Sequence, residues 1–150
     1  MELVVTDTTP LIALDRAGHL HLLPALFDVT APPAVVSEFG QRPSWLREHP
    51  VPDPSRVTAL LETLDIGEAE AIALAEALPN ARLLIDERRG RRIARSLNLR
   101  VTGTAGVLLV AKGAGLISHV RPLLDALIND HGLHLSAALR SATLREAGEA

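Results

Sequence analysis

The sequence of 150 residues contains no cysteine and no tyrosine, and only one tryptophan and two phenylalanines. The absence of cysteine excludes disulfide bonds, thiolate nucleophiles and zinc sites with Cys ligands. Aromatic residues make up 2% of the chain, which argues against binding bases mainly by stacking on aromatic side chains. Hydrophobic residues nevertheless make up 47%, so the core must consist of Leu, Val, Ile and Ala, which favours an α/β or all-α protein.

Long hydrophobic runs and an excess of positive charge are also missing. The uncharged run from Val101 to Ala111 is about half a membrane span, so we expect no membrane helix. The acidic Glu2 stands where a secretory signal carries basic residues, and we therefore expect a cytoplasmic protein. The net charge of −3 gives no overall attraction to nucleic acid, so such a partner would need a local basic patch.

Short apolar runs typical of strands alternate with longer stretches of helical pattern, which predicts a single domain over 1–150 with a parallel sheet and helices on both faces. The predicted strands are 2–7, 28–33, 82–86 and 99–104. The predicted helices are 10–27 (broken near Gly18), 34–41, 57–67, 68–81, 88–98, 105–117 and 119–132. Four prolines predict an irregular connection over 42–56, and the last dozen residues are expected to form a short strand or helix with a polar tail.

Five carboxylates interrupt apolar surroundings at related places in this pattern. Two follow predicted strands and three lie near the starts of helices: Asp7, Asp86, Glu38, Glu68 and Glu70. In a parallel sheet, strand carboxyl ends and the helix starts that follow them share one edge, so four or five of these groups are expected to converge there. Like charges this close need protons or hard cations, and an all-oxygen set favours Mg²⁺ or Mn²⁺. Phosphodiester hydrolysis is the common task of such a site.

Each carboxylate also has a structural interpretation. Asp7 could cap the helix that begins near Pro10, and Asp86 could cap the one at 88–98. Glu38 could be a solvated helix residue, while Glu68 and Glu70 could complement a helix macrodipole. Taken together, this interpretation requires every one of them to gather at the same edge by accident.

A basic segment follows Asp86 directly. Five arginines fall within eight residues: Arg88, Arg89, Arg91, Arg92 and Arg95. On a helix, all but Arg89 share one face through their three-and-four spacing, and guanidinium groups bind phosphates. A polyanionic substrate beside an acidic metal site would need such a stripe. The alternative is a solvated face whose arginines pair with Glu76 or Glu87.

Motifs spread along nearly the whole chain, in order, resemble the PIN domain superfamily, and most closely its prokaryotic DUF3368-type, VapC-like branch. They are DTTPLIAL, PPAVVSE, GEAEAIALA, LLIDERRGRRIA and VTGTAGVLLVAKGAGLI. The resemblance implies a three-layer α/β/α sandwich on a mostly parallel sheet. It also implies a Mg²⁺- or Mn²⁺-dependent nuclease site of acidic residues. Many relatives are ribonuclease toxins of toxin–antitoxin pairs, and these are usually dimeric.

Carried over by position, the resemblance implies roles for individual residues. The first-strand aspartate corresponds to Asp7, with Thr8 or Thr9 as the accompanying hydroxyl that contacts substrate. Glu38 is the helix glutamate and Asp86 the fourth acidic position. The third position is Glu68 or Glu70, of which the distance to Asp86 favours Glu68. Glutamate here replaces the family's usual aspartate and lengthens the arm by one methylene.

The sequence therefore predicts a metal-dependent endoribonuclease with Asp7, Glu68 and Asp86, or Glu70, as metal ligands and Glu38 as a further catalytic carboxylate. The face of Arg88, Arg91, Arg92 and Arg95 would bind RNA. Expected partners are an RNA substrate, a cognate antitoxin and a second copy of the chain. The alternative function is a catalytically weak or inactive PIN-fold module that binds nucleic acid or protein.

Overall fold

The computed structural model describes residues 1–150 and contains one five-stranded sheet in which all strands are parallel. The strands are β1 (Glu2–Thr6), β2 (Phe27–Ala31), β3 (Arg47–Glu48), β4 (Arg82–Leu84) and β5 (Arg100–Thr102). Their spatial order is β3-β2-β1-β4-β5. The chain therefore builds outward from β1 in one direction and then returns to build from its other side. This makes the space beyond the ends of β1 and β4 a topological switch point, where α/β proteins bind their ligands.

The central strand β1 is hydrophobic because both of its faces and both of its edges are covered. Val4 and Val5 are fully buried. Val4 lies opposite Val29 of β2 on one side and Arg82 of β4 on the other. Strands buried on both faces of a parallel sheet consist of continuous rather than alternating apolar residues, which explains the run Leu3-Val4-Val5.

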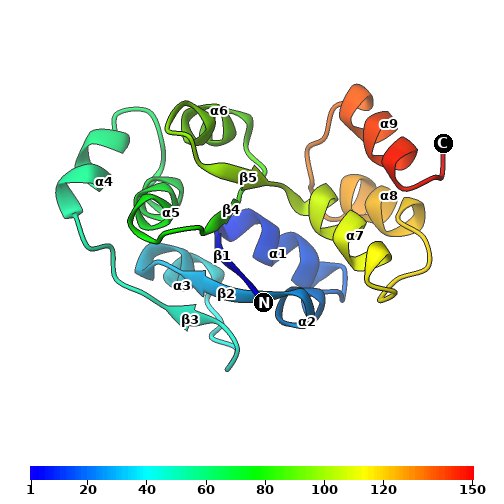
Figure 1. The fold of residues 1–150 in the computed structure, drawn as a ribbon, viewed down its shortest axis with the longest axis horizontal. Coiled ribbons are helices and arrows are strands. Elements are labelled where there is room, and N and C mark those ends of the chain that lie inside the picture. Colours follow the sequence, from blue (N-terminus) through cyan, green and yellow to red (C-terminus); the bar gives the residue numbers. More distant parts are fainter.

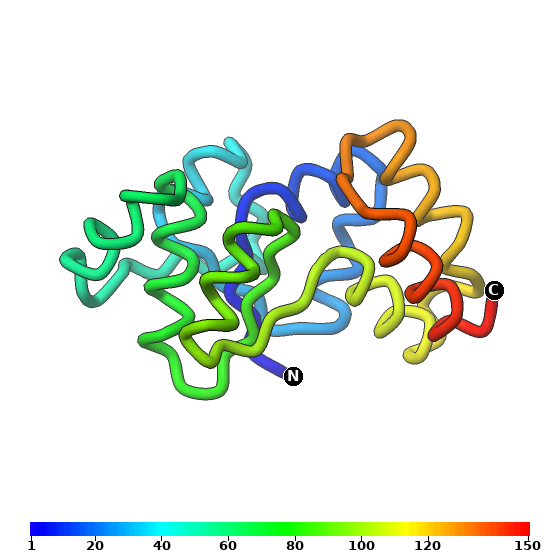
Figure 2. The backbone as a smooth tube through the Cα atoms, turned by 90° about the horizontal axis from the view of Figure 1, so that it is seen from above, coloured from blue at the N-terminus to red at the C-terminus, as the bar shows by residue number.

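Nine helices surround the sheet and complete the predicted α/β/α sandwich (Figure 1). They are α1 (Thr8–Arg16), α2 (Leu22–Leu26), α3 (Pro33–Phe39), α4 (Pro54–Leu60), α5 (Ile66–Ala77), α6 (Arg88–Ser96), α7 (Thr104–Gly113), α8 (Arg121–Asp130) and α9 (Ala137–Glu146). Figures 1 and 2 show α4 and α5 at one end of the molecule and α7, α8 and α9 gathered at the other. The largest side chains of the core are leucines and isoleucines, as the shortage of aromatic residues requires.

Helix α5 is the most enclosed of the helices, and its small side chains are the reason. Its run Ala69–Ala75 contains four alanines, and every residue of the run except Glu70 is buried. Alanine side chains let the helix approach β1 and β4 closely while α3, α4 and α6 pack around it. The first turn of α5 is thereby held beside the switch point.

The C-terminal residues are tied to α7 and α8 by one carboxylate. Glu149 accepts hydrogen bonds from the backbone N–H groups of Val120 and Arg121, at 2.7 and 2.9 Å, and from the ammonium of Lys112 at 3.0 Å. These donors lower the pKa of Glu149 from its usual 4.5 to about 2, the two backbone groups contributing most. The last helix is thus fixed to the body of the domain by hydrogen bonds as well as by apolar packing.

The observed elements match the expected alternation, with two corrections. The stretch 42–56 was predicted to be irregular, yet it contains the edge strand β3 and the start of α4, whose first turn is capped by Asp53. The helix expected over 57–67 ends at Leu60, and α5 begins after its N-cap residue Asp65. The break expected near Gly18 is present, since α1 and α2 are separate helices and Gly18 between them has a positive φ of 76°. Near the C-terminus, where a short strand or helix was expected, the chain forms the helix α9. No helix is long and apolar enough to cross a membrane.

Candidate functional site

Asp7 stands at the switch point, directly after β1 and before α1. Its backbone N–H donates to the carbonyl of Leu84, the last residue of β4, at 2.9 Å. Strand pairing therefore fixes Asp7 next to the segment that carries Asp86. The residue occupies the N-cap position of α1, but its side chain makes no capping hydrogen bond. The structural interpretation of Asp7 as a helix cap is thus not supported by its geometry.

Asp7 is 4% exposed as a residue, and its carboxylate lies among like charges. Burial is the largest influence and raises its pKa from 3.8 to about 7. The backbone N–H of Thr8 lowers the pKa in part, whereas the charges of Asp65, Glu38 and Asp86 raise it further. A buried carboxylate with no cation and no cap is costly, which marks this position as a functional candidate.

Asp86 follows β4 and is held by the start of α7. Its Oδ1 accepts from the backbone N–H of Thr104 at 2.7 Å, and its Oδ2 from the Thr104 hydroxyl at 2.5 Å. Burial raises the pKa of Asp86, while these two hydrogen bonds and the nearby charge of Arg91 oppose the rise. Asp86 therefore does not cap α6; Glu87 does so, accepting from the N–H groups of Arg89 and Gly90.

Glu68 is buried in the first turn of α5, where it forms a capping box with Asp65. The Glu68 backbone N–H donates to Asp65 Oδ1 at 2.9 Å, and the Asp65 N–H donates to Glu68 Oε1 at 3.3 Å. The other oxygen, Glu68 Oε2, is buried without any hydrogen-bond partner. Burial foremost, and then the neighbouring Asp65, raise the pKa of Glu68 to about 8. Glu68 thus has a structural role and an unused oxygen.

Glu38 reaches the same place from α3. A Cβ built on Gly67 would lie 2.6 Å from Glu38 Oε1, so the carboxylate rests directly on the backbone of α5. Helix α3 ends just beyond, at Gly40, whose φ of 75° is one that glycine adopts without strain. The close approach of α3 to α5 at Gly67 is what brings Glu38 within electrostatic range of Asp7.

Glu70 lies elsewhere. Its Oε1 accepts a hydrogen bond from the backbone N–H of Ala34 at 2.9 Å, in the first turn of α3. Residues two apart on a helix point in nearly opposite directions, so Glu68 and Glu70 cannot both face the switch point. Glu70 therefore faces the start of α3, whereas Glu68 lies in the first turn of α5 beside Asp65 and near Glu87.

The two threonines after Asp7 differ from each other. Thr8 is 5% exposed, and its hydroxyl is buried without a hydrogen-bond partner, whereas Thr9 is exposed. The Thr8 hydroxyl is thus a second buried oxygen without a hydrogen-bond partner, in addition to Glu68 Oε2. Polar groups of this kind are rare in native proteins, which makes these oxygens candidates for binding an ion or a substrate.

Four arginines of α6 are exposed, and the fifth is turned inward. Arg88, Arg89, Arg92 and Arg95 are exposed, and none of them takes part in an ion pair. The partners that a solvated face would have used are occupied, because Glu76 pairs with Arg56 and Glu87 caps α6. Arg91 is only half-exposed and donates to the carbonyl of Ile85 at 3.1 Å. The predicted four-arginine face therefore contains three exposed members and one that lies beside Asp86.

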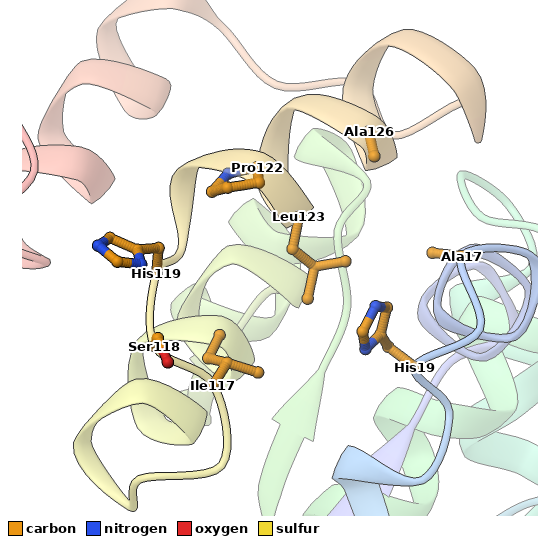
Figure 3. Close-up of a pocket in the computed structure, with 8 residues that line it drawn as sticks. All are labelled: Ala17, His19, Ile117, Ser118, His119, Pro122, Leu123 and Ala126. Atoms are coloured by element: carbon orange, nitrogen blue, oxygen red, sulfur yellow. The ribbon is translucent and has the colours of Figure 1, made fainter.

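A separate hollow of about 420 Å³ lies at the opposite end of α1 from Asp7, between that helix and the start of α8 (Figure 3). It is lined mainly by apolar residues together with His19, Ser118 and His119. None of the predicted site residues lines it. The acidic residues at the switch point are thus distinct from this hollow.

A comparison with protein families supplies the context for this geometry. The family DUF3368, described as a PIN domain, matches residues 3–149. The chain belongs to the PIN domain family. Among curated proteins, no match was found. PIN domains are generally nucleases and typically use divalent metal ions, so the acidic cluster of this PIN domain is the place to test for such an ion.

The donor set of this PIN domain fits a hard divalent cation. All candidate ligands are oxygens, two of the buried ones lack partners, and burial and like charges raise the pKa of Asp7. No three His, Asp or Glu side chains are arranged as a ready ligand set, however, and both oxygens of Asp86 are bonded to Thr104. The cluster consequently concentrates negative charge without forming a closed coordination shell.

Sequence analysis missed two residues of this cluster. The charge of Asp65 raises the pKa of Asp7, and its side chain caps the helix that carries Glu68. The signal was present in the segment DIGE, since an N-cap residue followed by Glu three positions later is a capping box. Thr104 had no comparable signal, because its contact with Asp86 joins residues 18 apart in the sequence.

The different positions of Glu68 and Glu70 lead to a prediction. We expect Glu70→Ala to leave the Kd for Mn²⁺ unchanged and to lower the free energy of unfolding by about 1 kcal/mol, because a helix N-terminus loses its cap. Glu68→Ala should weaken Mn²⁺ binding at least tenfold. Calorimetry and denaturant unfolding of both variants measure the two effects. Equal weakening of Mn²⁺ binding by both substitutions would contradict the assignment.

Proposed function

We propose that this PIN domain is a metal-dependent endoribonuclease whose site is formed by Asp7, Glu38, Glu68 and Asp86, with Asp65 as an added carboxylate. The observation that carries the proposal is Asp7, a buried carboxylate at the switch point with no cap, no ion pair and three acidic neighbours. A fold gains no stability from such an arrangement, so its benefit is functional.

Mg²⁺ or Mn²⁺ is the cofactor we propose, held by Asp7, Glu68 and Asp86. When bound, such an ion activates water and offsets charge on the scissile phosphate. Glu38 lies at the exposed border of the cluster, where a carboxylate can accept a proton from water. The Thr8 hydroxyl is placed beside Asp7 with a free donor, and Thr9 on the exposed side is available to a substrate oxygen.

RNA is the proposed substrate, bound through its phosphates by the exposed arginines Arg88, Arg92 and Arg95. These residues begin two positions after Asp86 and have no carboxylate partners. An α-helix rises about 1.5 Å per residue, so they extend the basic surface by roughly 10 Å from the acidic site. With aromatic residues so scarce, recognition through phosphates is favoured over base stacking.

This arrangement predicts a salt effect. Replacing Arg92 and Arg95 together by Gln should weaken binding to single-stranded RNA and lower the slope of log K against log salt by about 1.4, roughly 0.7 for each lost phosphate contact. The value of kcat at saturating RNA should change little. Fluorescence anisotropy at several salt concentrations measures the slope, and Arg145→Gln on the remote helix α9 is the control. An unchanged slope would show that α6 does not contact the phosphates.

The likeness to toxins of the VapC type extends the proposal to a role in a toxin–antitoxin pair. In that role the chain acts in the cytoplasm as a homodimer and is blocked by an antitoxin that covers the acidic cluster. Induced expression of the wild-type protein should then arrest growth, and co-expression of the antitoxin should relieve the arrest. Light scattering of the purified protein measures its oligomeric state.

A second candidate function is a PIN-fold module that binds nucleic acid or protein with little or no catalysis. The observation that favours it is Asp86, whose two oxygens are both bonded to Thr104. One experiment separates the two: incubation of end-labelled single-stranded RNA and DNA with the protein in Mn²⁺ and in EDTA. Cleavage of RNA that EDTA abolishes supports the nuclease. RNA binding that persists in EDTA without cleavage in Mn²⁺ supports the binding module.

A further inference from the structure

Arg91 differs from every other arginine of α6. Its side chain is half-buried, whereas the other four are exposed, and its Nη1 donates to the carbonyl of Ile85 at 3.1 Å. Like the other four, it belongs to no ion pair. On a helix with about 100° per residue, Arg91 lies roughly 60° to one side of Arg88, whereas Arg92 lies roughly 40° to the other. Arg91 is thus at the border of the basic face, next to the segment that carries Asp86.

Gly103 shows how closely Arg91 and Asp86 face each other. A Cβ built on Gly103 would lie 2.6 Å from Arg91 Nη1 and 2.8 Å from Asp86 Oδ1. Both charged groups therefore occupy the space that any other residue at 103 would fill. The glycine is needed here for room, since its φ of −111° is one that other residues adopt.

Two charged groups act on Arg91, the guanidinium of Arg95 on the same helix and the carboxylate of Asp86. Asp86 in turn acts on Asp7, together with Glu38 and Asp65, and Arg91 is the cation that acts on Asp86. A positive charge fixed there reduces the mutual repulsion of these carboxylates. The same charge also repels any divalent cation that approaches them.

Resting on the proposed metal site, we propose that Arg91 is the built-in counter-ion of the acidic cluster, and that it competes with the divalent cation instead of binding substrate phosphate. In this role Arg91 is a positioning residue that acts through Asp86. With this charge in place, the protein can fold without metal. It then binds the metal more weakly than it would without Arg91.

The test compares Arg91→Gln with the neighbouring control Arg92→Gln. Calorimetry on metal-free protein measures the Kd for Mn²⁺, and thermal unfolding measures Tm in EDTA and in Mn²⁺. We expect Arg91→Gln to lower Tm in EDTA and to tighten Mn²⁺ binding roughly tenfold, so that Mn²⁺ raises its Tm more than that of the wild type. Arg92→Gln should change neither quantity. Arg91→Lys, which keeps the charge, should hold the Kd within about threefold of wild type.

Three results would overturn the inference. A lower Tm without tighter Mn²⁺ binding would give Arg91 a purely structural role. Unchanged Mn²⁺ binding with weakened RNA binding would make it a phosphate ligand. Equal tightening by Arg91→Lys would exclude charge as the cause.

Folding defects and failure of the proposed function have their own outcomes. If Arg91→Gln is unfolded in EDTA, folding on addition of Mn²⁺ supports the inference, and failure to fold in Mn²⁺ overturns it. Mn²⁺ binding by wild type with no tightening in the variant overturns this inference alone. Absence of Mn²⁺ binding in both proteins overturns the proposed metal site as well.

Discussion

Asp7→Asn is expected to reduce RNA cleavage at least a thousandfold while making the metal-free protein more stable. The activity is lost because an amide cannot supply the anionic oxygen at the switch point, and a lost contribution of about 4 kcal/mol to the transition state corresponds to a thousandfold. The stability rises because Asn retains the shape of the side chain and removes the buried charge.

The size of the stabilising effect follows from the pKa of Asp7. Its rise from 3.8 to about 7 means that ionised Asp7 disfavours the folded state at pH 8 by on the order of 4 kcal/mol. Below about pH 4 the carboxyl is protonated in both states, and the substitution should then have little effect. Urea unfolding at pH 4 and pH 8, in EDTA, measures the difference.

Asp15→Asn is the matched control because it makes the same chemical change at the other end of α1. Asp15 accepts a hydrogen bond from Gln41 and lies outside the cluster, so activity should remain within a fewfold of wild type. If Asp7→Asn instead lost stability in proportion to its activity, Asp7 would be a structural residue. An unchanged rate of cleavage would place the catalytic site elsewhere.

Metal-free protein is expected to lose stability as the pH rises from about 4 to about 8, and Mn²⁺ is expected to restore it. The folded-state pKa values of Asp7 and Glu68, about 7 and about 8, both exceed the unfolded values of 3.8 and 4.5. Across that window the folded state binds more protons than the unfolded state, so the slope of unfolding free energy against pH is negative. Above about pH 9 both groups are ionised in both states and the curve should level off.

The loss should amount to several kcal/mol, because burial raises the pKa of both groups in the folded state. Glu149 acts in the opposite direction at lower pH. Its folded pKa of about 2 lies below the unfolded 4.5, so its contribution is complete above pH 4.5 and lost as the pH falls toward 2. Stability in EDTA should therefore be greatest near pH 4 to 5.

Thermal unfolding between pH 3 and pH 9, in EDTA and in saturating Mn²⁺, tests this expectation. Mn²⁺ should raise Tm strongly at pH 8 and hardly at pH 5, where protons already neutralise the cluster. The double variant Asp7→Asn, Glu68→Gln should remove most of the slope in EDTA, whereas Asp130→Asn on α8 should retain it. A flat wild-type profile in EDTA would mean that these carboxylates are not buried together.

The sequence predicted the fold class because the relevant signals are local. The apolar run before Asp7 and the run before Asp86 each identify a buried strand, and the helical stretches between them require a parallel sheet. The carboxyl ends of those strands were therefore expected at one edge, and the structure places Asp7 and Asp86 beside each other there. The spatial order of the strands was not predictable in this way, because pairing of β1 with β4 joins segments almost eighty residues apart.

The orientation of side chains around each helix was decided only by tertiary packing. Helix α5 is buried nearly all round, so its hydrophobic pattern did not indicate whether Glu68 or Glu70 faces the site. The spacing of the arginines likewise grouped Arg91 with Arg88, Arg92 and Arg95, although Arg91 turns toward Ile85 and Asp86. In both helices, the direction in which each side chain points depends on how the helix is rotated about its own axis. Packing against neighbouring elements determines that rotation.

By itself, then, the sequence determined that this chain forms an α/β protein of the PIN family with acidic residues at the ends of its strands. Only the tertiary structure decided that Glu70 caps α3, that Asp65 and Thr104 join the cluster, and that Arg91 lies beside Asp86. The physical reason is that periodicity and capping are properties of neighbouring residues. The free energy of a buried charge instead depends on groups that the fold brings together from distant parts of the chain.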